Sequence, residues 1–225
     1  MAAPVKNTRE RLLFAAERLF ADYGVDGVSL RQVNAEAGQR NSSAAHYHFG
    51  SKEALIEAIY KNRMVQVNQR RAIMIEELSA AGKQGDLRSL VAAIVWPIAE
   101  QIYETEGGLS YVRFVAQIHG RPRMDIMAYA RQGAAEPLDW VHVRVREVLS
   151  HIPPAVLNPR IGFMFSLIYA TLAHRENMAA LPGMRISRNT PLFVNNLIDS
   201  IVGSLAATVS QETLEELENP APDNP

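Results

Sequence analysis

Polar side chains that could bind a nucleic acid are concentrated in a short stretch near the N-terminus. Asn, Ser, His and Tyr side chains donate and accept hydrogen bonds, and at the beginning of a helix they suit base edges and phosphate oxygens in a major groove. Lys52 adds a positive charge beside the Ser51 cap, where the N-terminus of a second helix could meet a phosphate. The candidates in this stretch are Asn41, Ser42, Ser43, His46, Tyr47, His48 and Lys52.

Other kinds of chemistry have little support in the sequence. The chain has no cysteine, which excludes disulfides, thiolate zinc sites and a cysteine nucleophile. His46 and His48 are two residues apart, so on a helix they point in different directions and suit a shared metal ion poorly. The sequence contains neither a Gly-x-Ser-x-Gly elbow nor a phosphate-binding glycine loop. We therefore expect no catalytic residues, no metal and no cofactor.

Two short helices joined by a tight turn must position the polar stretch. Ser29 and Gln32 have the spacing of a capping box at the beginning of the first helix, which we expect over Ser29–Ala37. The turn centres on Gly38, and the second helix is expected over Asn41–His48. This is the arrangement of a helix-turn-helix. Ordinary helical hairpins share the pattern, so it does not by itself establish a nucleic-acid partner.

Helical spacing of apolar residues continues along the rest of the chain, and strand signals are nearly absent. A first helix is expected from the cap Thr8 to the stop Gly24, and a long one from Ser51 towards Ser79. These patterns predict an all-α chain of about nine helices. The later helices are expected over residues 86–104, with Pro97 as a kink or break, and over 109–119, part of 124–132, 137–150, 159–181 and 190–217.

The charged residues are distributed unevenly along a nearly neutral chain. The 23 Lys and Arg and 24 Asp and Glu give a net charge of −1. Residues 1–75 hold eleven of the basic residues and seven of the acidic ones, a net of +4, so the remainder carries −5. A basic N-terminal part on an acidic body suggests a partner for the basic part. Within it, Arg18 and Arg63 are expected to be ordinary surface charges.

The stretch from Thr8 to Tyr60 resembles the DNA-binding domain of the TetR-like one-component transcriptional regulators. A Tyr-His-Phe-x-x-Lys-x-x-Leu block after a helix-turn-helix is a strong signature of this all-α family. The resemblance covers about a quarter of the chain, and the rest matches by architecture. The matching segments are Ala15-Ala-Glu-Arg-Leu19-Phe20, Tyr23-Gly24, Ser29-Leu-Arg-Gln-Val33, Ala37-Gly38 and Tyr47-His-Phe-Gly-Ser-Lys52-Glu-Ala-Leu55.

The resemblance implies a homodimer that binds double-stranded DNA. Its two recognition helices would enter successive major grooves of a near-palindromic operator, with half-sites roughly 34–36 Å apart. By position, the residues expected to contact bases, phosphates or sugars are Ser29, Arg31, Arg40, Asn41, Ser42, Ser43, His46, Tyr47, His48 and Lys52.

Two of these positions depart from the family pattern. Arg40 stands where an apolar residue is usual, and His46 replaces the first of a usual pair of aromatic residues. The base preference of relatives therefore cannot be carried over to this chain. Arg40 becomes an additional candidate for contact with a phosphate or a guanine.

The resemblance also implies a helix-turn-helix domain at 1–54 and a ligand-binding and dimerisation domain at 55–218. The proline-rich segment 219–225 cannot propagate a helix and is expected to be a disordered tail. The two long helices near the C-terminus carry small residues that permit close approach of a second copy. Most aromatic residues of the larger domain are expected in its core, and a subset should line a pocket, where His119 and His142 could also make polar contacts. The pocket candidates are Trp96, Tyr103, Tyr111, Phe114, Met127, Trp140, Phe165, Tyr169 and His174.

The expected function is that of a transcriptional regulator, and more specifically a repressor that a small organic effector releases from its operator. The alternatives are a ligand-binding helical protein or a helical enzyme without a DNA function. The longest apolar run, Leu90–Ala99, is half the length of a membrane helix, and the N-terminus lacks an apolar stretch of signal-peptide length. We therefore expect a cytoplasmic protein without a membrane partner.

Overall fold

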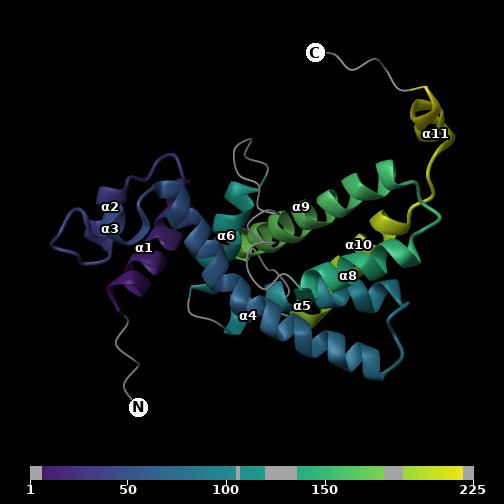
Figure 1. Ribbon diagram of the computed structural model, residues 1–225, viewed down its shortest axis with the longest axis horizontal. Coiled ribbons are helices and arrows are strands. Elements are labelled where there is room, and N and C mark those ends of the chain that lie inside the picture. The colour runs from purple at the N-terminus through teal and green to yellow at the C-terminus, as the bar shows by residue number, and fades with distance from the viewer. Residues whose placement is uncertain (1–6, 105–106, 120–135, 180–189, 220–225) are drawn as a thin grey trace.

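The computed structural model describes residues 7–104, 107–119, 136–179 and 190–219, and these residues form helices and turns without a strand. The molecule is elongated, with α1, α2 and α3 grouped at one end and the other helices beyond them (Figure 1). The prediction of an all-α fold with an N-terminal three-helix unit is confirmed. The helices are α1 (Thr8–Tyr23), α2 (Leu30–Glu36), α3 (Ala44–Phe49), α4 (Lys52–Ala80), α5 (Leu87–Glu104), α6 (Gly108–Ile118), α8 (Glu136–Val148), α9 (Pro154–Ala179), α10 (Thr190–Ala206) and α11 (Gln211–Glu218).

The two ends of α1 are fixed by local hydrogen bonds. The cap is Asn7 and not Thr8 as predicted, because Asn7 and Glu10 form the capping box: Asn7 Oδ1 accepts from the Glu10 N–H at 2.9 Å, and Glu10 Oε2 accepts from the Asn7 N–H at 3.1 Å. The predicted stop is confirmed. Gly24 has a φ of +74°, which glycine adopts without steric strain, and its N–H donates to the Phe20 carbonyl.

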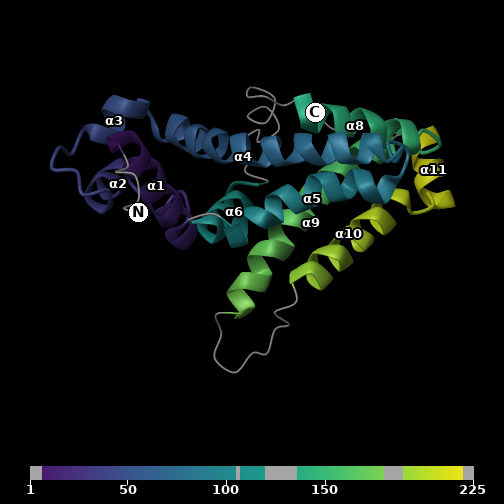
Figure 2. The same ribbon diagram turned by 90° about the horizontal axis from the view of Figure 1, so that it is seen from below.

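Helix α4 connects the N-terminal unit to the rest of the molecule. Its predicted cap is confirmed, since Ser51 Oγ accepts from the Ala54 N–H at 3.1 Å. The 29 residues of α4 span roughly 43 Å at 1.5 Å per residue. Along this length α4 contacts α1 and α3 first, and then α5 and α8 (Figure 2). The helix is continuous through the expected domain boundary at residues 54 and 55.

The core of the larger part lies among α5, α6, α9 and α10, which contact one another in the pairs α5–α6, α5–α10, α6–α9 and α9–α10. Helix α5 is the most deeply placed, and its apolar stretch 90–99 is almost entirely buried. Pro97 lies inside this helix without ending it. The expected helix within 124–132 falls outside the described residues.

The expected beginning of α9 at Pro159 is wrong. The helix begins at Pro154, whose missing N–H costs nothing at a first helical position, and the Pro153 carbonyl accepts from the N–H groups of Val156 and Leu157. Pro159 removes a single later bond, to the Ala155 carbonyl. Both Ala155 and Pro159 are exposed, so water can hydrate that carbonyl.

The expected single helix over 190–217 is also wrong, because α10 and α11 are separate helices bent by 50° about the break between them. Arg160 of α9 donates to the carbonyl oxygens of Leu205 at 2.9 Å and Ala207 at 2.6 Å, which satisfies the C-terminal end of α10. Ser210 then caps α11 through the Thr213 N–H. The break divides one expected helix into two, and the described residues form ten helices in all.

Candidate nucleic-acid interface

The predicted helix-turn-helix is present as α2, a turn and α3. Its capping box is confirmed: Gln32 Oε1 accepts from the Ser29 N–H at 2.8 Å, and Ser29 Oγ accepts from the Gln32 N–H at 3.3 Å. Gly38 ends α2 with a φ of +66°. The Ser29 hydroxyl also lies 2.8 Å from Gln32 Oε1, so the side chain that is expected at the DNA backbone already has local partners.

Asn34 fixes α3 against α2, and the sequence analysis did not single it out. Its side chain is 1% exposed. Oδ1 accepts from the Ala45 N–H at 2.7 Å, and Nδ2 donates to the Ser42 carbonyl. One amide therefore holds both the turn and the first turn of α3. Its position four residues after Leu30, on the face that carries Val33, is the signal in the sequence that could have identified it.

The recognition helix is shorter than predicted. It covers Ala44–Phe49 rather than Asn41–His48, because Asn41 is used in the turn: Asn41 Oδ1 accepts from the Ser43 N–H at 2.9 Å. Ala44 and Ala45 are buried against α2, and Phe49 is partly buried. Asn41, Ser42 and Ser43 thus lie before the helix and not in its first turn.

The outward face of this segment is polar and accessible. Tyr47 is 85% exposed, and its ring meets the His48 ring edge-on at 5.3 Å between centroids. None of the predicted contact residues of this face forms an ion pair with another part of the described chain. The exposed members are Ser29, Arg31, Arg40, Asn41, Ser42, Ser43, His46, Tyr47 and His48.

Lys52 differs from the other predicted contacts because it is only partly exposed. Its ammonium group lies 5.9 Å from the centroid of the Phe20 ring of α1, at the outer limit of a cation–π contact. Arg9 lies over Phe49 in the same way, at 5.2 Å. Both basic side chains therefore pack against the three-helix unit and keep their charged ends near its surface.

A buried ion pair joins α1 to α4, which corrects the expectation that Arg63 is a surface charge. Arg63 and Glu17 are each 3% exposed, and the guanidinium donates Nε–H to Oε2 at 2.8 Å and Nη2–H to Oε1 at 2.7 Å. Burial raises the pKa of Glu17, and the hydrogen bond and charge of Arg63 oppose that rise. Arg18 is exposed as expected, and it pairs with Glu36 of α2.

Helix α6 holds the other side of α1. Gln117 Nε2 donates to the Ala21 carbonyl at 3.0 Å, and Arg113 pairs with Asp22 at 3.1 Å. The rings of Phe20 and Phe114 stack with centroids 6.0 Å apart. The helix-turn-helix is therefore attached through α1 to two helices of the larger part, α4 and α6. Phe114, a pocket candidate, serves this contact.

The other pocket candidates occupy different environments. Tyr111, Phe165 and Tyr169 are buried in the core, and Trp96 and Trp140 are partly buried. His174 is exposed, which argues against a place in an internal pocket. Met127 and the side chain of Tyr103 lie outside the described residues.

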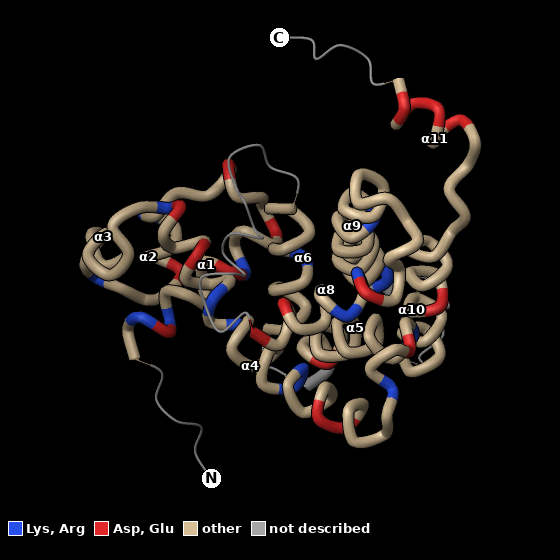
Figure 3. The backbone as a smooth tube through the Cα atoms, turned by 45° about the vertical axis from the view of Figure 1, so that its right-hand side comes forward, with Lys and Arg blue, Asp and Glu red and all other residues tan. Residues whose placement is uncertain are grey.

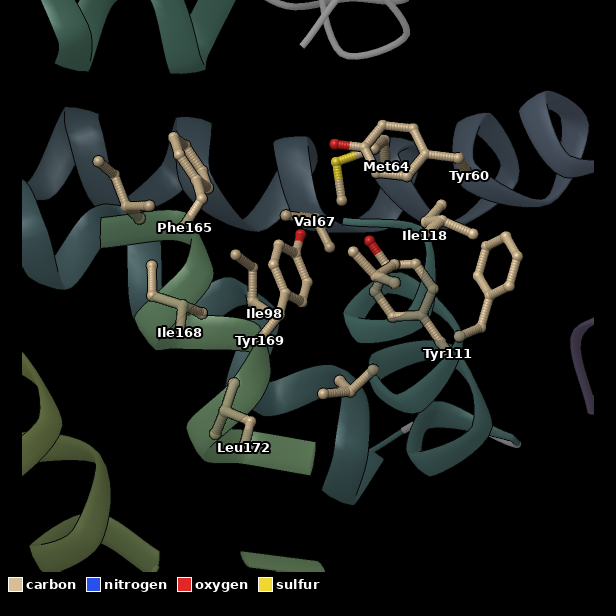
Figure 4. Close-up of a cluster of buried hydrophobic side chains, with 14 of the residues drawn as sticks. Tyr60, Met64, Val67, Ile98, Tyr111, Ile118, Phe165, Ile168, Tyr169 and Leu172 are labelled. Atoms are coloured by element: carbon tan, nitrogen blue, oxygen red, sulfur yellow. The ribbon is translucent and has the colours of Figure 1, made fainter. Parts of the chain in front are cut away.

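A buried polar cluster that the sequence analysis missed surrounds Arg71 of α4. Arg71 is 1% exposed and donates Nε–H to the Ala93 carbonyl at 3.2 Å and Nη1–H to Asn68 Oδ1. The Tyr111 and Tyr169 hydroxyls point to the same side of the core beside Val67, and Tyr60 lies above them on α4 (Figure 4). Arg71 continues the spacing of Tyr60, Met64 and Val67 on one face of α4, so that spacing could have predicted its burial.

The titratable groups of this cluster are shifted mainly by burial. Burial raises the pKa of Tyr60 and of Tyr111 well above 10.0, so both remain hydroxyls at neutral pH. Burial also raises the pKa of Tyr169, which Tyr111 and Arg71 partly oppose. Burial lowers the pKa of His142 of α8 to about 4, and the Arg71 charge adds to this.

Comparisons with known proteins agree with this architecture. Residues 12–59 match the family described as "Bacterial regulatory proteins, tetR family". Over 93 residues the chain is 32% identical to the HTH-type transcriptional repressor NicS of Pseudomonas putida, an alignment that spans 41% of this chain and 42% of NicS. Over 64 residues it is 36% identical to the HTH-type transcriptional repressor AcnR of Corynebacterium glutamicum, which spans 27% of this chain and 34% of AcnR. The chain thus matches less than half the length of these curated relatives.

The fold as a whole is shared with solved structures. AmtR of Mycobacterium smegmatis superimposes with a TM-score of 0.55 at 17% identity, over 96% of this chain and 97% of that one. The TetR family transcriptional regulator PfmR of Thermus thermophilus gives a TM-score of 0.53 at 18% identity, over 92% of this chain and 100% of that one. This structural similarity includes the larger helical part, and at 17–18% identity it shows a shared fold.

Proposed function

We propose that this chain, which is TetR-like in its N-terminal domain and in its fold, is a DNA-binding transcriptional regulator that acts as a homodimer and is released from its operator by a small organic molecule. The relatives with matching N-terminal segments are named transcriptional repressors. Repression is therefore the mode that we assign, and the cytoplasm is the compartment in which we expect the protein.

The observation that carries this proposal is the exposed polar face of α3. Asn34 fixes α3 through two hydrogen bonds, so the face does not need to order itself on binding. Tyr47 and His46 project from it, and Arg40 and Arg31 flank it. A rigid helix with donors, acceptors and cations on its outer side fits the major groove and its phosphates. We assign base or phosphate contact to the ten residues predicted from the sequence.

The proposed dimer interface is formed by α9 and α10. An exposed stripe on α9 runs through Phe163, Leu167, Ala170 and His174, at the helical spacing of one face, and Phe163 is 62% exposed. Leu192 of α10 is also exposed. A second copy would cover this apolar surface in a four-helix arrangement. The segment Pro154–Arg175 has the length and apolar composition of a membrane span, a property that core helices of soluble proteins share, and 39% of it is buried.

The proposed division of labour places DNA binding in residues 1–54 and effector binding and dimerisation in 55–218. An effector would act by shifting the population of two arrangements of the N-terminal unit relative to α4 and α6. The alternative, a helical ligand-binding protein or enzyme without a DNA function, leaves the fixed polar face of α3 without a role.

The decisive experiment selects bound sites from random double-stranded DNA with the purified chain and then measures affinity for the winning site over a salt series. A specific complex whose affinity falls steeply with salt supports the proposal. Equally weak binding to every duplex would overturn it.

Lys52→Ala adds a residue-level test to the same salt series. If the Lys52 ammonium meets a phosphate, its loss weakens binding to all sequences and reduces the salt slope by about one. Lys83→Ala is the matched control, because Lys83 is exposed in the turn after α4, away from α3. An unchanged slope in Lys52→Ala rejects the phosphate contact and leaves the DNA function standing on the selection result.

A further inference from the structure

Two arginines of α4 are buried, and their surroundings differ in one respect. Arg63 has a carboxylate partner, Glu17, which binds it in a bidentate manner. Arg71, two helical turns later, has no carboxylate partner within the described residues: its acceptors are the neutral oxygens of Ala93 and Asn68. The titratable groups that face Arg71 are the phenols of Tyr169, Tyr60 and Tyr111, which are neutral at physiological pH, and the imidazole of His142.

An uncompensated charge in a protein interior is costly, and burial correspondingly lowers the pKa of Arg71. Guanidinium has five N–H donors, and two of them have acceptors among the described residues. The remaining N–H groups of the guanidinium can donate two parallel hydrogen bonds to the two oxygens of a carboxylate. Arg71 is thus a buried guanidinium whose acceptors among the described residues are both neutral.

Two further polar atoms of the same region lack hydrogen-bond partners among the described residues. They are Nε2 of His142 and the hydroxyl of Tyr111, both buried; the Tyr111 hydroxyl faces that of Tyr169 but forms no hydrogen bond of normal geometry with it. Buried polar atoms without a partner are rare in folded proteins, and they indicate a water molecule or a ligand. His142 is on α8 and packs edge-on against Phe165 of α9 at 5.8 Å, so α4, α6, α8 and α9 all contribute side chains to one place.

We propose that this place binds an organic anion, and specifically a carboxylate on an apolar body, with Arg71 as its counter-ion. The proposal rests on the proposed function and names the chemical class of its effector. In this proposal the Tyr111 and Tyr169 hydroxyls donate to the carboxylate beside the guanidinium. The buried side chains around these hydroxyls are apolar, which suits an apolar body, and they include Met64, Val67, Ile98, Phe165 and Leu172 (Figure 4). A single guanidinium with neutral hydroxyls suits the one charge of a carboxylate better than the two of a phosphate monoester.

The same cluster contacts the ion pair that joins α4 to α1. The Arg63 guanidinium lies 5.8 Å from the centroid of the Tyr111 ring, and Phe14 of α1 lies on the Arg63 guanidinium at 5.5 Å. An anion that accepts a hydrogen bond from the Tyr111 hydroxyl therefore acts on a side chain that also contacts the Glu17–Arg63 pair. This gives a bound carboxylate a direct physical route to the helix that carries the N-terminal unit.

The test uses the full-length chain and three matched pairs of probes: benzoate with benzamide, phenylacetate with phenylacetamide, and hexanoate with hexanamide. Affinities are measured by titration calorimetry, and thermal unfolding midpoints are measured in parallel. We expect at least one carboxylate to bind and to raise the midpoint while its uncharged amide does neither. In Arg71→Gln the affinity for that carboxylate should fall roughly tenfold to hundredfold. Arg70→Gln is the control, since Arg70 is the adjacent arginine, partly exposed and paired with Glu100 at 2.9 Å.

If Arg71→Gln does not fold, Tyr111→Phe provides the second variant. It removes the unpartnered hydroxyl with little change of volume, so we expect unchanged or higher stability together with weaker carboxylate binding. Three outcomes would overturn the inference: a carboxylate and its amide bind equally well, none of the three carboxylates binds, or both variants keep wild-type affinity. The polar cluster would then bind water and not an anion. DNA binding without any probe is scored separately: a chain that binds its selected site but no carboxylate refutes this inference alone, and a chain that binds a carboxylate but no DNA refutes the proposed function.

Discussion

At the scale of single residues, the exposed side chains of α3 and the buried ones beneath it have separate tasks. The Asn34 side chain is buried, and both of its hydrogen bonds are made inside the protein, to Ala45 and Ser42. Tyr47, 85% exposed, contributes nothing to the core. A change at Tyr47 should therefore affect recognition without affecting stability, which makes it the cleanest probe of the proposed interface.

We predict that Tyr47→Ala lowers affinity for the selected DNA site by about tenfold or more, the effect of losing about 1–3 kcal/mol of base discrimination. The thermal midpoint should stay within about 1 °C of wild type, since exposed substitutions change stability little. Tyr23→Ala is the control, because Tyr23 is 69% exposed on α1. Binding is measured by fluorescence anisotropy on the selected site and on single-base variants, and a uniform loss across all variants would make Tyr47 a backbone contact.

His142 gives a prediction about pH. Its pKa is about 4 in the folded chain and near 6.5 when unfolded, so the unfolded chain binds a proton first as the pH falls. The stability that the neutral imidazole contributes is complete above pH 6.5 and is lost between pH 6.5 and 4, up to about 3 kcal/mol. Urea unfolding of wild type and His142→Gln across this range measures the difference. His151→Gln, at an exposed histidine, should follow wild type, and a parallel course for His142→Gln would show that His142 does not titrate with unfolding.

At the scale of helices, the junction of α1 with α4 and α6 is the connection that the proposed effector would have to influence. Its parts are of different kinds: a buried ion pair to α4, and a stacked aromatic pair and surface hydrogen bonds to α6. The buried pair is the most sensitive part, because removal of one partner leaves a charge without compensation.

We predict that Glu17→Leu destabilises the chain by about 3–5 kcal/mol, whereas Glu17→Leu with Arg63→Met recovers most of the loss. The physical reason is that the double variant buries no charge. Urea unfolding monitored by circular dichroism provides both values. A double variant as unstable as the single one would mean that the pair contributes through geometry that two apolar side chains cannot replace.

Several helix ends set by neighbours in the sequence could be predicted, although the beginnings of α1, α3 and α9 were placed wrongly, and an end set by a distant residue could not. Ser29 with Gln32, the Ser51 cap and Gly24 all act within four residues, and each was predicted correctly. The end of α10 depends on Arg160, 45 residues before Leu205, and the sequence pattern continues through the break.

The candidate site shows the same limit. The residue types of the α3 face and the capping box of α2 were predictable, since they depend on spacing alone. The Glu17–Arg63 pair spans 46 residues, so packing decides that Arg63 is internal, whereas the burial of Arg71 follows the helical spacing of Tyr60, Met64 and Val67.

At the scale of the whole molecule, only part of the positive charge of residues 1–75 is available to the proposed interface. Of the eleven basic residues in the first third of the chain, Arg63 and Arg71 are buried, and Lys61 and Arg70 pair with Glu57 and Glu100. Lys, Arg, Asp and Glu are interspersed around α1–α3, and acidic residues cluster on α11 (Figure 3). The excess of positive charge over residues 1–75 therefore lies largely on α4, and the positive character of the proposed interface comes from Arg31, Arg40 and Lys52.

The proposed dimer makes a prediction at this scale. Phe163→Glu places a charge in the exposed stripe of α9 and should give a monomer at micromolar concentration, with normal helix content and strongly weakened binding to a two-half-site DNA. Sedimentation velocity measures the mass. Val143→Glu is the control, because Val143 is similarly exposed, at 52%, on α8. A Phe163→Glu chain that remains dimeric would require another interface.

The length of α4 has a mechanical consequence. Arg63 is held to α1 about eleven residues, or roughly 16 Å, after the helix begins, and Arg71 lies roughly 12 Å further on. A rigid rod pivoting at Arg63 by about 5° moves its Arg71 end by roughly 1 Å and its Lys52 end by roughly 1.4 Å in the opposite direction. In the proposed dimer the Lys52-end displacements of the two copies add, so the distance between the two N-terminal units changes by nearly 3 Å against a groove repeat of roughly 34 Å. A displacement smaller than one bond length at the buried cluster is therefore amplified to a size that matters for matching two grooves at once.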